Sequence, residues 1–179
     1  MKGIWTIGHS TRSLADFIGC LRTHEIEALA DVRKLPGSRR YPHFDQDALA
    51  ASLSEHGILY RHFPGLGGRR KGDPASHNTA WRHPAFRAYA DYLETAEFAE
   101  AIGELIALAE EKRVALMCAE AVWWRCHRGL IGDYLKVRGW RVLHIIDEKP
   151  AKEHPFTGAA SVRDGELNYE LNPPGEDAT

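Results

Sequence analysis

Residues 116–130 (LMCAEAVWWRCHRGL) concentrate side chains that could perform chemistry. A thiol, a carboxylate, an imidazole and a guanidinium serve acid–base catalysis, nucleophilic attack, metal binding and anion binding. A purely structural segment has little need for all of them so close together, so this segment is the first candidate for a functional site. Its reactive residues are Cys118, Glu120, Cys126, His127 and Arg128.

A zinc site is one interpretation of the two cysteines, with His127 or His9 completing the set of ligands. Structural zinc sites usually have two short paired spacings such as Cys-x-x-Cys. Seven residues separate Cys118 from Cys126, and the sequence has no second pair of this kind. We therefore expect no bound metal and no cofactor.

A thiol nucleophile is a second interpretation. A cysteine at a strand end and beside a helix N-terminus has its thiolate stabilised, which would apply to Cys118 or Cys126. The alternative for Cys118 is a small buried residue that ends a central strand. The cysteine-phosphatase pattern places an arginine six positions after the cysteine, where this chain has Trp124, so that pattern is excluded. Cys20 belongs to an apolar helix face and is expected in the core.

Short apolar runs alternate along the chain with segments of helical period, and these elements must position the reactive residues. Strands are predicted at residues 3–7, 26–32, 57–63, 113–118 and 141–146. Helices are predicted over about ten residues after Ser13 and at residues 45–56, 81–94, 96–111 and 126–138. An Asp164-Gly165 turn predicts a hairpin of residues 160–163 and 166–169.

This alternation predicts an α/β fold, a single-domain three-layer structure with a mainly parallel central sheet of about five strands. Residues 1–172 are expected to form the domain, and residues 173–179 a frayed tail. Sheets of this kind bind ligands at the carboxyl ends of their strands. We therefore expect one pocket at this edge, lined by His9, Asp31, Arg33, Glu120 and Arg128.

The acid–base candidates at this edge are one imidazole and two carboxylates. His9 follows a glycine at a strand end and could act as general acid or base near neutral pH, or could hydrogen-bond a neighbouring loop. Asp31 and Glu120 could divide acid and base work between them. Alternatively, they pair with Arg33 and Arg128 to hold the loops.

Anion-binding candidates lie at the same edge. His127 and Arg128 begin a helix, whose N-terminus favours anions, although a buried salt bridge of Arg128 to Asp31 or Glu120 is an equal alternative. Ser10 could contact a phosphate or make a turn hydrogen bond.

Two loops, residues 33–43 and 61–72, carry only basic charges, among them Arg69, so the mouth of the pocket should be positive despite a net charge of −2. Trp124 or its neighbour Trp123 could stack on a base, with at least one of them expected to be packing.

Motifs along nearly the whole chain resemble those of the domain-of-unknown-function 488 family. They are T-I-G-H-S at residues 6–10, D-V-R at 31–33, Pro36, Ser38, Phe44, L-G-G at 66–68, C-A-E at 118–120, C-H-R at 126–128 and His154-Pro155. The resemblance implies an α/β fold and a shared polar cleft. It carries no biochemical activity over to this chain.

Composition restricts the remaining possibilities. The chain of 179 residues has 44% hydrophobic and 27% charged residues, typical of a soluble globular domain. It has no stretch that resembles a signal peptide or a membrane span, and three cysteines form no disulfide framework, so a reducing cytoplasm is expected.

The sequence therefore favours an enzyme, a hydrolase or transferase acting on a phosphate-bearing substrate, nucleotide or nucleic acid. The leading alternative is a module that binds an anionic small molecule or nucleic acid without catalysis. A metal-dependent enzyme is a third class, and no membrane partner is expected.

The spacing of the cysteines and histidines yields a first prediction. Because no paired-ligand pattern is present, the purified protein should contain no stoichiometric zinc, as measured by elemental analysis. One zinc per chain that disappears in a Cys126→Ser variant would contradict this expectation.

Overall fold

The structure, a computed structural model, describes residues 2–171, so the predicted tail at residues 173–179 lies outside the described part. The strands are β1 (Gly3–Gly8), β2 (Ala28–Asp31), β3 (Leu59–His62), β4 (Val114–Cys118), β5 (Arg141–Ile145), β6 (Lys152–Glu153), β7 (Ser161–Arg163) and β8 (Glu166–Asn168). The helices are α1 (Leu14–Thr23), α2 (Gln46–Glu55), α3 (Pro84–Tyr92), α4 (Ala96–Glu111) and α5 (Arg128–Val137). Short 3-10 turns are η1 (Pro42–Phe44), η2 (Pro64–Leu66) and η3 (Trp123–Arg125).

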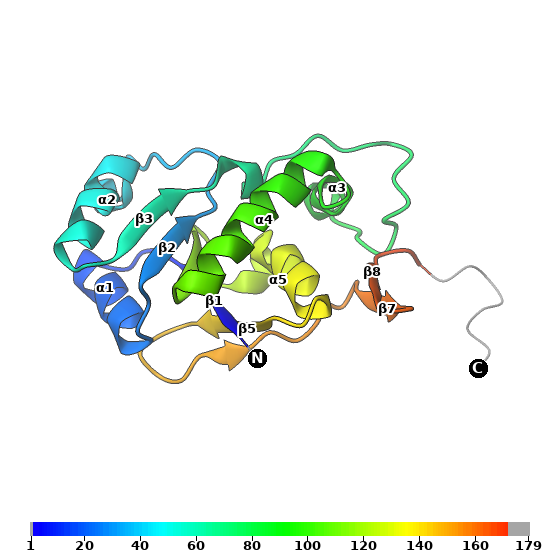
Figure 1. Cartoon of the computed structure of the whole chain (residues 1–179). Coiled ribbons are helices and arrows are strands. Elements are labelled where there is room, and N and C mark those ends of the chain that lie inside the picture. The colour runs from blue at the N-terminus through cyan, green and yellow to red at the C-terminus, as the bar shows by residue number, and fades with distance from the viewer. Residues whose placement is uncertain (1, 172–179) are drawn as a thin grey trace.

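The central sheet has the strand order β3-β2-β4-β1-β5-β6. The first five strands are parallel, and the short β6 adds an antiparallel edge to β5 (Figure 1). Strands β1, β2 and β4 are almost wholly buried, which explains why they read as continuous apolar runs. The predicted α/β fold with a mainly parallel sheet and a C-terminal hairpin is confirmed.

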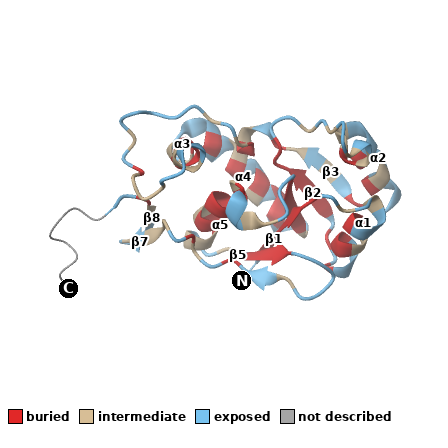
Figure 2. Cartoon of the chain, turned by 180° about the vertical axis from the view of Figure 1, so that it is seen from behind, coloured by how far each residue is buried: buried red, intermediate tan, exposed pale blue. Residues whose placement is uncertain are grey.

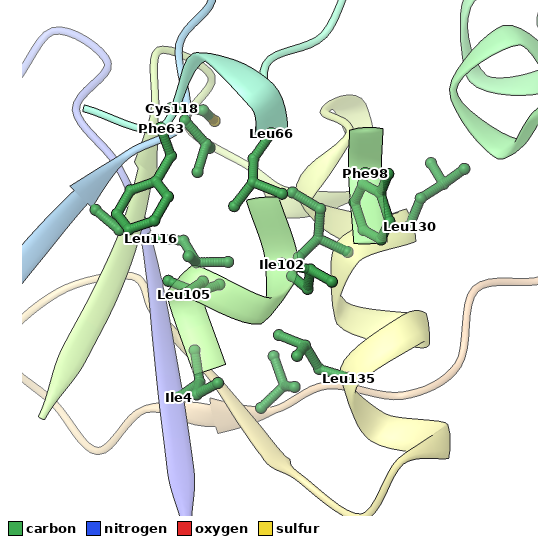
Figure 3. Packing of buried hydrophobic residues seen from close by; sticks show 14 of the residues in the cluster. Ile4, Phe63, Leu66, Phe98, Ile102, Leu105, Leu116, Cys118, Leu130 and Leu135 are labelled. Carbon is green, nitrogen blue, oxygen red and sulfur yellow. The ribbon is translucent and has the colours of Figure 1, made fainter. Parts of the chain in front are cut away.

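Two apolar clusters, one on each face of the sheet, form the core. Residues of α3, α4 and α5 pack on one face, and residues of α1 and α2 pack on the other. Figure 3 shows Leu105 of α4 near Leu116 of β4 and Phe98 of α4 near Leu130 of α5, within the same cluster as Ile4 of β1. Buried residues gather in the strands and in the helix faces turned toward them (Figure 2). Within residues 2–171, no helix has the length and apolar character needed to cross a bilayer.

Two helices begin later than the apolar period predicts. Helix α3 begins at Pro84 rather than at Trp81, because proline suits a first helical position and His83 Nδ1 accepts the Ala85 N–H at 3.2 Å. Helix α5 begins at Arg128, since the backbone before it forms the η3 turn and is then extended at Cys126. The second boundary matters for the site, because it leaves Cys126 and His127 outside the helix, between η3 and α5.

Strand alternation decides which side chains share a face of the sheet. In β1, Ile4 packs in the α5-side cluster and Trp5 in the α1-side cluster, so Thr6 points toward α5. The same alternation places Cys118 of β4 and His144 of β5 on the α5 side. Polar side chains of three neighbouring strands therefore meet under one helix.

Gly8 ends β1 and pairs with Cys118 of β4, and a side chain there would overlap the carbonyl oxygen of Glu120. Because main-chain hydrogen bonds from His9 and Ser10 hold the segment after β4 against the end of β1, Gly8→Ala should destabilise the fold by about 3 kcal/mol. The control is Gly103→Ala in α4, where a Cβ meets nothing within 4 Å and the free energy of unfolding should rise by about 0.5–1 kcal/mol. Urea unfolding monitored by circular dichroism measures both; equal effects of the two substitutions would contradict the close approach at Gly8.

Candidate functional site

A cavity of 740 Å³ opens at the carboxyl ends of the parallel strands. The sequence-predicted residues that line it are His9, Ser10, Arg33, Arg69, Cys118, Glu120, Cys126 and His127. They follow four different strands, as the geometry of a parallel sheet requires. The expectation of one shared pocket is met for His9, Arg33 and Glu120, but it is wrong for Asp31 and Arg128, which are buried outside the cavity lining.

Asp31 is excluded from the cavity because strand alternation turns its side chain toward the α2 side of the sheet. Ala30, its neighbour in β2, packs in the α5-side cluster. The Asp31 carboxylate accepts hydrogen bonds from Arg33 Nε at 2.9 Å and Nη2 at 2.8 Å, and from the Tyr60 hydroxyl. Burial and the hydrogen bond to Asp31 raise the pKa of Tyr60. The structural ion pair between Asp31 and Arg33 is therefore present, and Asp31 is unsuited to acid–base work in the cavity.

Arg128 is only 1% exposed, and no carboxylate of residues 2–171 forms a salt bridge with it. Its Nη2 donates to the main-chain carbonyl of Glu120 at 2.9 Å, and its Nη1 donates to Thr6 Oγ1 at 3.1 Å. The expected alternative of a salt bridge to Asp31 or Glu120 is thus wrong. Glu120 contributes its carbonyl to Arg128, while its side chain stays exposed at the cavity.

A buried chain of hydrogen bonds links Arg128 to a distant carboxylate. Thr6 Oγ1 lies 2.5 Å from His144 Nδ1, His144 Nε2 lies 2.8 Å from His154 Nδ1, and His154 Nε2 lies 2.8 Å from Asp133 Oδ1. With both rings neutral, every donor meets an acceptor in one direction, from Arg128 through Thr6 and the histidines to Asp133. Burial, with the neighbouring His154 and Arg128, lowers the pKa of His144 to about 2, which keeps that ring neutral.

Asp133 ends this chain as a fully buried carboxylate in α5. Besides His154, it accepts hydrogen bonds from the Thr157 N–H at 2.9 Å, the Thr157 hydroxyl at 2.6 Å and the Tyr169 hydroxyl at 2.7 Å. Four donors satisfy its oxygens, so the carboxylate is stable without water.

Sequence reasoning missed Asp133 and His144, and it noted Thr6 and His154 only as parts of motifs. The available signal was a polar residue inside each of two buried apolar strands, Thr6 in GIWTIG and His144 in RVLHI.

The two thiols lie together at the wall of the cavity. Cys126 Sγ lies 2.9 Å from Cys118 Sγ, 3.5 Å from His127 Nδ1 and 3.4 Å from the Arg128 N–H. Burial opposes ionisation of Cys126, but the hydrogen bond from Cys118 and the contacts with His127 and Arg128 hold its pKa well below the usual range. Burial and the neighbouring Cys126 raise the pKa of Cys118 well above its usual range. Of the two thiols, Cys126 is therefore the one whose thiolate its surroundings favour, while the Cys118 S–H lies 3.7 Å from the Glu120 carbonyl.

His9 is held as a neutral ring. Burial lowers its pKa, its ring stacks on Phe44 at 4.4 Å, and its Nδ1 lies 3.0 Å from the Ser10 carbonyl. A carbonyl only accepts, so Nδ1 carries the proton and Nε2 keeps a free lone pair. His9 can thus act as a base in the cavity.

Basic residues dominate the charged lining of the cavity. Besides Arg33, which is neutralised by Asp31, the lining contains Lys34, Arg40, Arg69 and Arg125. Glu120 is the single carboxylate of this lining. The expectation of a positive mouth is met, although Arg61 and Arg70 of the basic loops point elsewhere. Arg61 pairs with Glu104, and Arg70 donates to main-chain carbonyls and lies over the Tyr92 ring.

Two lining residues have a left-handed backbone, Ser10 with φ 46° and Arg69 with φ 59°. Residues other than glycine rarely adopt this conformation, and such strain is often found at functional sites. The tryptophans play no part in the lining. Trp123 stacks on His144 with an interplanar angle of 7°, and Trp124 is 56% exposed outside the cavity. In the described part of the chain, no three His, Cys, Asp or Glu side chains are grouped to share a metal ion.

The fold and the site define an α/β protein with a polar cavity at the carboxyl edge of a parallel sheet. The family model described as "Domain of unknown function DUF488" matches residues 13–135, and the chain belongs to this family. Searches of curated proteins and of solved structures gave no match.

The buried chain from Arg128 to Asp133 yields a stability prediction. Asp133→Asn places an amide NH₂ among four donors and removes the charge, so unfolding should become easier by about 3 kcal/mol, the order found when one partner of a buried ionic group is lost. Asp164→Asn is the matched control, because Asp164 is exposed in the hairpin turn and should change stability by less than about 0.5 kcal/mol. The denaturant midpoints of unfolding of the two variants test this prediction. Similar midpoints would show that the Asp133 carboxylate does not stabilise the buried hydrogen-bonded chain.

Proposed function

We propose that the protein is an enzyme, a hydrolase or transferase, that acts on a phosphate-bearing substrate held in the cavity. One observation carries this proposal: Cys126, the thiol whose thiolate is stabilised, lines a cavity whose other charges are mainly positive. A thiolate is the reactive form of cysteine, and cations in a concave site attract an anionic substrate. The cytoplasm is the compartment we propose, because it keeps both thiols reduced.

The cations supply the binding part of the proposal. Arg69 and Arg125 line the cavity, and neither forms a salt bridge to any carboxylate of residues 2–171. Their guanidinium groups are therefore free to bind phosphate oxygens in pairs. A volume of 740 Å³ suits a nucleotide or a phosphorylated sugar. The exposed ring of Trp124, next to Arg125, offers a surface for a base.

The thiolate and the neutral imidazole supply the chemistry. The phosphate is the group held by the cations, and the electrophilic centre of the substrate lies over Cys126. Cys126 Sγ attacks this centre, a bond to sulfur forms, the bond to the leaving group breaks, and the leaving group takes a proton from solvent. His9 Nε2 then removes a proton from water or from an acceptor molecule, whose oxygen bonds to the same centre. The bond to sulfur breaks, and Cys126 is released as the thiolate. Glu120, exposed at the same cavity, is a second candidate base.

A thermal-shift screen with nucleotides, phosphorylated sugars and short DNA and RNA identifies the substrate class. A compound that binds the folded state raises the melting temperature. We expect a shift with a small phosphate compound, reduced in Arg125→Gln and unchanged in Arg22→Gln, a variant of an exposed arginine in α1. Equal shifts in both variants would contradict phosphate binding in this cavity.

Turnover of the compound found in that screen separates an enzyme from a binder. Cys126→Ser should reduce turnover by about 10²–10⁴-fold while binding is kept, because a serine hydroxyl is not ionised near neutral pH. Cys20→Ser is the control and should keep full turnover. Glu120→Gln should lose turnover only if Glu120 is the base. Binding without turnover in the wild type would favour the alternative, a non-catalytic nucleotide- or nucleic-acid-binding module.

A further inference from the structure

The two cavity thiols lie close enough for a reaction that the proposed function does not use. Cys118 Sγ and Cys126 Sγ are 2.9 Å apart, and both residues line the cavity. Reaching the S–S distance of about 2.05 Å in a disulfide requires a movement of less than about 1 Å. Cys20, the third cysteine, packs in the cluster on the opposite face of the sheet.

The backbone around the pair can accommodate this movement. Cys118 is the last residue of β4, and Cys126 has an extended backbone between η3 and α5. Residues 119–125, which connect the two cysteines, are mostly exposed. A small shift confined to Cys126 and the exposed residues just before it leaves the Glu120 carbonyl, the buried strands and α5 in place.

We propose that Cys118 and Cys126 form a redox-active dithiol that hydroperoxides oxidise to an intramolecular disulfide. Cys126 Sγ attacks a peroxide oxygen, so an S–O bond forms, the O–O bond breaks, and the released hydroxide or alkoxide takes a proton from solvent. Cys118 Sγ then attacks the sulfur of the Cys126 sulfenic acid. An S–S bond forms, the S–O bond breaks, and water leaves with the proton of Cys118. Two thiols lose two electrons, which the peroxide gains.

The surroundings assign the two roles in this reaction. His127 Nδ1 lies where it can accept the Cys126 proton, and the Arg128 N–H donates to Cys126 Sγ, so both favour the attacking thiolate. Burial and the neighbouring Cys126 raise the pKa of Cys118, and its Sγ lies 2.9 Å from Cys126 Sγ, so Cys118 is the adjacent resolving thiol. The disulfide would also remove the nucleophile of the proposed enzyme. Only this last consequence rests on the proposed function.

Peptide mapping of the intact wild-type chain tests the proposal without any substrate. Trypsin cleaves after Arg113, Arg125 and Arg128, which separates Cys118 in peptide 114–125 from Cys126 in peptide 126–128. After treatment with excess hydrogen peroxide and alkylation of free thiols, we expect a disulfide-linked pair of these peptides. Two of the three thiols should be lost, and dithiothreitol should restore them.

Three variants, each checked for folding by circular dichroism, test the order of steps. Cys118→Ser should leave a sulfenic acid on Cys126 that dimedone traps, Cys126→Ser should keep its remaining thiols, and Cys20→Ser should behave as the wild type. If a variant fails to fold, the peptide mapping of the wild-type chain still tests whether the disulfide forms. Three intact thiols after peroxide treatment, or sulfinic acid on Cys126 without the linked peptides, would overturn the proposal.

Discussion

The buried guanidinium of Arg128 imposes the constraint on which the rest of the site depends. Arginine keeps its charge at any usable pH, and a buried charge without partners is very costly. The fold partners its two terminal nitrogens through the carbonyl of Glu120 and the hydrogen-bonded chain that ends at Asp133, while the buried Nε has no hydrogen-bond partner among residues 2–171. Strands β1 and β5, helix α5 and the segment around His154 are therefore joined by one set of polar contacts.

This constraint shapes the wall of the cavity. By holding the Glu120 carbonyl, Arg128 fixes the connection after β4 so close to the end of β1 that only glycine fits at position 8. The Arg128 N–H also contacts Cys126 Sγ, so the thiol pair is held at the start of the same helix. Asp133 does not line the cavity, but the hydrogen-bonded chain joins it to Arg128. A substitution near Asp133 can therefore change the position of the two thiols.

The groups that make Cys126 suited to nucleophilic attack also make it prone to oxidation. A thiolate stabilised by His127 and Arg128 reacts with a substrate electrophile or with a peroxide, and Cys118 stands within reach of the oxidised sulfur. Under the two proposals, one site would combine a catalytic state with a protected, reversibly oxidised state. The lysine and arginine side chains of the cavity would bind the substrate in the catalytic state, and oxidation to the disulfide would not require them.

The sequence by itself determined the element types, the parallel sheet and the edge where reactive residues gather. The apolar period of each segment, a property of local sequence, determines the element types. The general rule that parallel strands end at one edge then places the reactive residues together. Most of the predicted lining, including His9, Cys118 and Cys126, follows from them.

Tertiary structure alone decided which groups meet. Asp31 lies on the other face of the sheet because a shift of one residue along a strand reverses the direction of a side chain, and strand ends are the least certain part of a sequence pattern. The hydrogen-bonded chain of Arg128 could not be predicted from the sequence either. Its members come from four separate segments: Thr6, His144, His154 and Asp133. The pairing of a buried donor with its acceptor depends on distances between segments, and only the packed chain sets those distances.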